Sequence, residues 1–160
     1  MVDALPMILV PQHFYLYNHY AIEQVLGPAE MERLLRPAGY KSAYFWCEKE
    51  AAFHGLSGEQ VFWHYLKRLS QRGWAQFTVL SVEPDGARAR VRVDHSIFVR
   101  ESPPSAGRKV CYMFRGWFAG SLEWVGESCG KSCRLSVAEV QCAAEGAHDH
   151  CLFEVVPAGG

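Results

Sequence analysis

Five of the six cysteines lie in the last third of the chain, between residues 111 and 151, and only Cys47 lies earlier. Structural disulfides are rare in reducing compartments, where clustered thiols are more often metal ligands, catalytic groups or buried small side chains. The N-terminal segment carries Asp3 and two prolines and lacks the basic and unbroken apolar regions of a signal peptide. We therefore expect a cytoplasmic protein whose clustered cysteines favour a metal site.

The size of the chain predicts one domain over residues 1–160, because 160 residues with 49% hydrophobic side chains suffice for a single core. Lysine and arginine number 16 against 17 aspartate and glutamate. This balance provides no overall basic field, so we expect neither nucleic acid nor an anionic membrane surface as a partner. No apolar run approaches the roughly 20 residues that span a bilayer.

Helices are predicted in the first half of the chain. Ser57 and Gln60 have the spacing of a capping box, and Gly73 supplies a stop signal, so residues 58–72 are expected to form an amphipathic helix. A shorter helix is expected near residues 19–35, interrupted at its Gly-Pro pair.

The pattern then changes to the period of two that is typical of strands. Residues 77–81 and 87–99 alternate around a Pro-Asp-Gly turn and predict a hairpin, whose second strand has three arginines on one face, expected to be solvated. Residues 108–125 contain small residues and predict a buried helix pressed against a sheet, and residues 134–144 and 151–156 predict two last strands. The order indicates an α+β fold with an antiparallel sheet packed against helices.

The spacing of Glu139 and Cys142, three residues apart, and of Cys151 after a glycine-containing turn would let one strand pair present three ligands to one point. Zinc accepts thiolates and a carboxylate together, and a fourth protein ligand closes a structural site. Cys111 is the natural fourth candidate, because a helix N-terminus favours a thiolate. Buried or inert thiols remain the alternative to metal binding.

Other side chains compete for these roles. His148 or His150 could replace Cys111 or Glu139, and Cys129 and Cys133 are rival ligands, a redox pair or thiols without a role. The remaining histidines show no spacing typical of a catalytic triad, and His54 and His64 are interpreted as structural.

The segments CYMFRGWFAG, EVQC, AAEG and CLFEV, spread over residues 105–157, resemble the C-terminal half of the 4-vinyl reductase domain. The resemblance implies an antiparallel sheet with helices, of the ligand-binding type found in NO-signalling and Golgi-transport proteins. It also implies Zn²⁺ held by Cys111, Glu139, Cys142 and Cys151, within residues 108–156. A longer segment between helix and strand departs from the family pattern and puts the register of Cys111 in doubt.

The same resemblance implies a pocket for a small apolar or aromatic molecule between sheet and helices. Trp46, His95, Tyr112 and Trp117 are our candidates for lining it. The family also implies a homodimer or a partner protein of a catabolic pathway. The first half of the chain resembles a group of 4-vinyl-reductase-like proteins encoded beside demethylases of methylated amines, several of which lack the cysteines.

Two functions of different classes follow. The first is a non-catalytic, zinc-stabilised small-molecule-binding protein that acts as a sensor or pathway accessory. The second is an enzyme, either a reductase or a metal-dependent catalyst, acting on a vinyl, tetrapyrrole or aromatic substrate. The chain contains no G-x-G-x-x-G fingerprint for a dinucleotide, which favours the non-catalytic interpretation.

Overall fold

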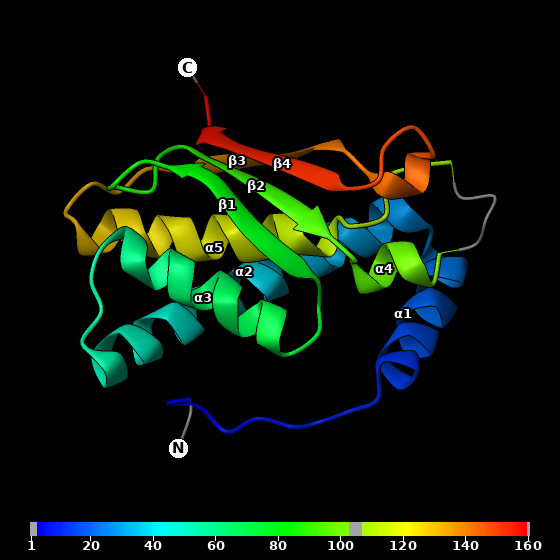
Figure 1. The fold of residues 1–160 in the computed structure, drawn as a ribbon, viewed down its shortest axis with the longest axis horizontal. Helices are drawn as coiled ribbons and strands as arrows, with labels where there is room; N and C mark the ends of the chain where they lie inside the picture. Colours follow the sequence, from blue (N-terminus) through cyan, green and yellow to red (C-terminus); the bar gives the residue numbers. More distant parts are fainter. Residues whose placement is uncertain (1–2, 103–106, 160) are drawn as a thin grey trace.

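The computed structural model describes residues 3–102 and 107–159 and has the α+β architecture expected from the sequence (Figure 1). Its helices are α1 (Gln12–Leu26), α2 (Pro28–His54), α3 (Glu59–Gln71), α4 (Ile97–Arg100) and α5 (Met113–Ser128). Its strands are β1 (Gln76–Val82), β2 (Ala89–Asp94), β3 (Leu135–Gln141) and β4 (Cys151–Pro157), and a short 3₁₀ helix, η1 (Ala143–Glu145), precedes β4.

The four strands form one antiparallel sheet in the order β1-β2-β4-β3. Side chains alternate between its two faces: Cys151, Phe153 and Val155 of β4 are buried, whereas the arginines of β2 lie on the outer face and are exposed or half-buried. The sheet therefore buries one face against helices and leaves the other to solvent, as its alternating sequence requires.

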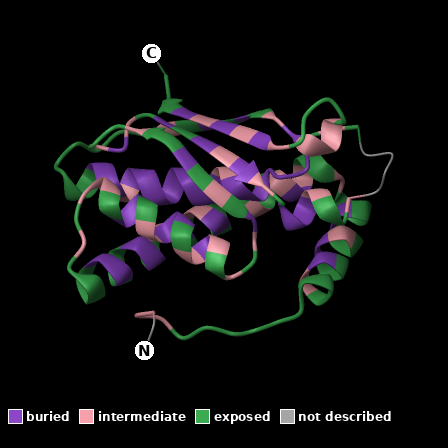
Figure 2. Cartoon of the chain, in the orientation of Figure 1, coloured by how far each residue is buried: buried purple, intermediate pink, exposed green. Residues whose placement is uncertain are grey.

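Helix α5 lies beneath the inner face of the sheet and forms the centre of the core (Figures 1 and 2). Phe118 packs edge-on against Phe153 with 5.1 Å between ring centroids, and Phe114 packs against Phe77 at the same separation. Such edge-to-face pairs add to the free energy gained by burying large apolar rings. The N-terminal end of α5 is thereby fixed relative to the sheet.

The small residues of α5 contact α2, not the sheet as we expected from the sequence. A Cβ atom at Gly116 would lie 2.5 Å from the carbonyl oxygen of Arg36, and one at Gly120 would clash with the backbone of Tyr40. The glycines therefore let two helix backbones touch, while the aromatic face of α5 meets the strands.

Three local expectations differ from the structure. The helix α3 forms as predicted, but Gly58 precedes it with no side-chain cap, so Ser57 does not form the capping box. The first helical region is two long helices broken at Gly27, and Pro37 lies within the second. The second strand ends at Asp94, because His95 adopts a positive φ of 55° and the chain turns into α4.

Candidate metal centre

A bulge in β3 determines which side chains reach the centre. The pairing with β4 shifts register between Glu139 and Gln141, which leaves Val140 without a partner on β4. Glu139 points to the buried face, and the extra residue returns the next inward position to Cys142 instead of Gln141. Bulges commonly re-aim side chains near functional sites. The bulge is the structural reason for the three-residue spacing in the sequence.

The four predicted ligands meet at one point. One donor atom from each of Cys111, Glu139, Cys142 and Cys151 lies within 4.8 Å of the others. The Sγ atom of Cys151 lies 3.8 Å from that of Cys111 and 3.6 Å from that of Cys142. A tetrahedral zinc ion with Zn–S bonds of about 2.3 Å requires sulfur separations of roughly 3.8 Å. The cluster therefore has the spacing that zinc would need.

Three different segments supply these side chains. Cys111 immediately precedes α5, Glu139 and Cys142 come from the end of β3, and Cys151 begins β4. All three thiols are buried, and Glu139 is only 8% exposed. The doubt over Cys111 that arose from the longer α5–β3 segment is resolved in geometric terms, because its sulfur lies within the cluster.

The carboxylate of Glu139 is the observation that points most directly to a cation. Neither of its oxygens makes a hydrogen bond among the described residues. An unpaired buried carboxylate is costly, and burial raises the pKa of Glu139 above its usual value. A divalent cation bound by the carboxylate would remove that cost.

The thiols are arranged to share negative charge. Burial raises the pKa of Cys111 well above its usual value, whereas hydrogen bonds from the thiols of Cys111 and Cys151 lower the pKa of Cys142. The hydroxyl of Ser96 lies 3.1 Å from Cys111 Sγ, and the backbone N–H of Ala143 donates to Cys151 Sγ at 3.3 Å. These outer contacts orient the sulfur atoms, as partners around metal sites commonly do.

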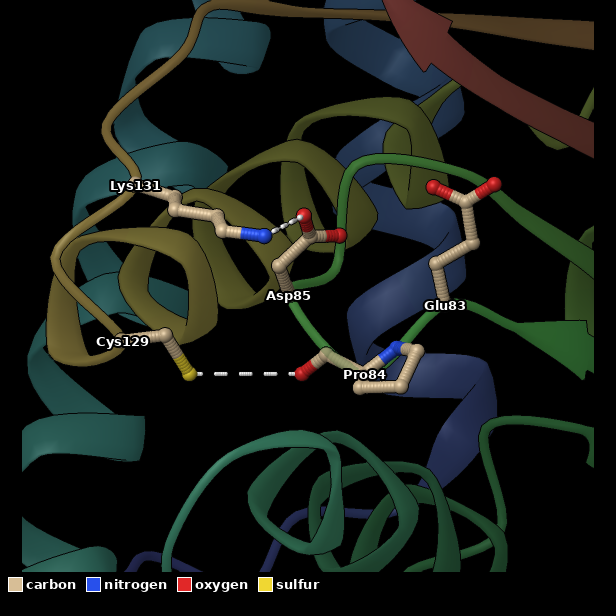
Figure 3. Close-up of a pocket in the computed structure, with 5 residues that line it drawn as sticks. All are labelled: Glu83, Pro84, Asp85, Cys129 and Lys131. Atoms are coloured by element: carbon tan, nitrogen blue, oxygen red, sulfur yellow. Dashed lines mark hydrogen bonds and ion pairs between the residues drawn. The ribbon is translucent and has the colours of Figure 1, made fainter.

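The alternative ligands lie outside the cluster. His150 hydrogen-bonds Asp149 at 2.6 Å and Gln141 at 3.0 Å, and His148 is exposed. Cys129 and Cys133 are exposed free thiols. Cys129 instead borders a shallow pocket of about 310 Å³, where Lys131 binds Asp85 at 3.2 Å (Figure 3).

A second cavity, of about 450 Å³, adjoins the cysteine cluster. Tyr112 and Glu139 line it together with three cationic side chains, Arg108, Lys109 and Arg115. Each cation has a partner: Arg108 contacts Glu23, Lys109 lies 2.7 Å from Glu145, and Arg115 donates to the carbonyl of Val137 at 2.8 Å and contacts Glu32. The cavity is thus charged but internally neutralised.

The four residues predicted to line a ligand pocket are not gathered in one place. Tyr112 borders the cavity beside the cysteine cluster and hydrogen-bonds Glu23 at 2.5 Å and His19 at 3.1 Å. Trp46 stacks on His64, and Trp117 packs on Trp74 and Phe114. His95 is exposed at the end of β2. The roles of these residues as ligand contacts stay predictions.

Comparison with known families accounts for both halves of the chain. A family described as a domain of unknown function (DUF5943) matches residues 1–80, and the 4-vinyl reductase domain matches residues 89–157. The chain belongs to the DUF5943 family and carries a 4-vinyl reductase domain. The resemblance to this domain that the cysteine-containing segments indicated is confirmed. None of the curated proteins matches the chain.

Two solved structures share the fold of the 4-vinyl reductase domain. The phenol-responsive sensory domain of the transcription activator PoxR, determined with phenol, is 18% identical with a TM-score of 0.77; the match covers 94% of this chain and 76% of that chain. Subunit 3 of a trafficking protein particle complex from Naegleria fowleri, covalently bound to palmitic acid, is 15% identical with a TM-score of 0.61, and the match covers 92% of this chain and 95% of that chain. At these identities the likeness concerns the fold, and it confirms the expected fold class.

Proposed function

We propose that this protein is a non-catalytic small-molecule-binding module stabilised by zinc, and that it acts as a sensor or as an accessory of a catabolic pathway. The observation that carries the proposal is the buried cluster of three thiols and one carboxylate, in which Glu139 has no hydrogen-bond partner among the described residues. Soft thiolates with a single carboxylate suit Zn²⁺ better than hard cations such as Mg²⁺ or Ca²⁺.

The metal would have a structural role in this arrangement. Four protein donors complete a tetrahedral shell and leave no position for water or substrate, which separates structural from catalytic zinc sites. Zinc would join the start of α5 to the bulged end of β3 and the first residue of β4. Its binding free energy would therefore add to the stability of the fold, and this favours the non-catalytic function over an enzyme.

The ligand would bind in the cavity beside Tyr112. The related sensory domain was determined with phenol, and we extend a small aromatic ligand to this chain as part of the proposal. The cavity wall combines Pro28, Ala29 and Ala138 with the phenol ring of Tyr112, so it offers apolar contacts next to polar groups that can orient a ligand.

We further propose that residues 1–160 form a single domain that is cytoplasmic and dimeric. Strand β1, which lies mostly in the segment matched by DUF5943, pairs with β2 of the 4-vinyl reductase domain, so the two matched segments share one sheet. Three thiol ligands require a reducing compartment. The N-terminal arm exposes Met7, Ile8 and Leu9, and α1 exposes Phe14 and Val25, which supports an apolar contact with a second copy.

The proposal is tested by native mass spectrometry of freshly purified protein, which reports metal, ligand and subunit number together. We expect one zinc ion in the cysteine cluster. Phenol or benzoate added at millimolar concentration should raise the melting temperature of the zinc-bound protein and of Tyr44→Phe, a matched exposed tyrosine, but not that of Tyr112→Phe. A protein that carries no zinc, or one that responds to neither compound, would contradict the proposal.

A further inference from the structure

Glu50, His54 and His64 form a second group of metal-type donors, remote in the fold from the cysteine cluster. Glu50 and His54 lie one turn apart at the end of α2, and His64 lies on α3. The turn between these helices contains Gly55 and Gly58, both with positive φ, and folds α3 back so that His64 faces Glu50. Figure 1 shows this turn at the left of the view, whereas the start of α5 and the β3–β4 connection lie at the right.

The spacing of the three donor atoms suits a metal ion. The Nε2 atom of His64 lies 2.8 Å from Glu50 Oε2, and that of His54 lies 3.2 Å from the same oxygen. The three side chains offer donors that all lie within 4.8 Å of one another. Metal–nitrogen and metal–oxygen bonds of about 2.0–2.2 Å place neighbouring ligands roughly 3.0–3.5 Å apart. Only small side-chain shifts separate this arrangement from a coordinated ion.

The charge of Glu50 calls for a cationic partner. Its side chain is fully buried, and the described residues place no lysine or arginine within 4.0 Å of its carboxylate. The nearby arginines Arg68 and Arg72 instead bind Asp3. A buried carboxylate is stable only when it is paired or coordinates a metal, so its neutralisation depends on the two imidazoles or on a cation between them.

Neighbouring groups hold the three side chains in place. The ring of Trp46 stacks on His64 with 5.4 Å between centroids, and Phe53 packs edge-on against His54 at 4.8 Å. The backbone N–H of Ala4 donates to Glu50 Oε1 at 2.5 Å, which leaves Oε2 facing the imidazoles. Such outer contacts fix ligand orientation in metal sites.

We propose that Glu50, His54 and His64 bind a divalent transition-metal ion of the zinc class. Two imidazoles and one carboxylate are typical ligands of zinc and neighbouring late first-row ions. The side chains of His54 and His64 are 32% and 19% exposed, respectively, so the remaining coordination positions face solvent. This second site is therefore open, in contrast to the closed cysteine cluster, and can accept water or an external ligand.

The test is metal binding to the full-length chain, first stripped with a chelator and then titrated with ZnCl₂ or CoCl₂ under reducing conditions. We expect the wild-type protein to bind one equivalent more than His54→Ala and one more than His64→Ala. Loss of a direct ligand should weaken this equivalent by more than the roughly 10- to 100-fold that loss of an outer contact costs. Exposed His148 is the matched control, and His148→Ala should bind as many equivalents as wild type.

Cobalt distinguishes the two sites, because only the cysteine cluster produces a thiolate-to-cobalt charge-transfer band. The equivalent lost in His54→Ala should contribute no such band, so failure of the proposed zinc role of the cysteines would leave this result unchanged. An unchanged number of equivalents in both His54→Ala and His64→Ala would overturn the site. A wild-type protein whose only bound cobalt shows the thiolate band would overturn it as well, without any variant.

Discussion

Replacement of Cys142 by serine is the perturbation that tests the zinc centre most sharply. Cys142 is fully buried, and its sulfur lies 3.6 Å from that of Cys151, so no other described thiol can take its place without movement of the backbone. Serine keeps the size of the side chain and removes the thiolate. The effect on stability should therefore come mainly from lost metal binding.

The magnitude follows from linkage between binding and folding. A ligand that binds only the folded state stabilises it by about 4.1 kcal/mol when its free concentration is 1,000 times the Kd. For a domain of this size each kcal/mol shifts the melting temperature by roughly 2–4 °C. We expect a strong chelator to lower the melting temperature of wild type by roughly 8–16 °C, and to leave that of Cys142→Ser unchanged.

The assay is thermal unfolding followed by circular dichroism, with and without chelator, together with elemental analysis of each sample. Cys129→Ser is the matched control, because Cys129 is an exposed free thiol outside the cluster. It should retain both the metal and the full response to chelator. The reasoning is refuted if zinc-loaded wild type and Cys142→Ser respond alike, or if wild type melts at the same temperature with and without chelator.

Two further perturbations address the helices. Gly116→Ala should lower the free energy of unfolding by about 2 kcal/mol despite alanine's higher helix propensity, because its Cβ would lie 2.5 Å from Arg36 O; chemical denaturation measures this, and an unchanged midpoint would contradict the close contact of α2 and α5. Burial lowers the pKa of His19 below 6.5, so its contribution to stability is present above pH 6.5 and is lost as pH falls through the folded-state pKa. Melting temperatures between pH 7.5 and 5 should fall less in His19→Gln than in wild type, and equal slopes would exclude His19 as the cause.

Local sequence patterns predicted most of the elements because they depend on neighbouring residues. The period of two around the Pro-Asp-Gly turn predicted the hairpin, and β1 and β2 pair as expected. The apolar spacing on α3 predicted that helix, although its expected cap was wrong because Gly58 takes the N-cap position. The glycines of α5 indicated a close contact, but the sequence did not show that α2 would make it.

Four cysteine-cluster ligands could be named from sequence, since Glu139, Cys142 and Cys151 lie close along the chain and a family resemblance supplied Cys111. Their meeting at one point depends on the β3 bulge and on the position of α5 beneath the sheet, which are properties of packing between distant segments. The group of Glu50, His54 and His64 was missed, because its only local signal is a four-residue spacing within one helix. The histidine on α3 joins it through the fold of the α2–α3 turn, and only the tertiary structure could decide that contact.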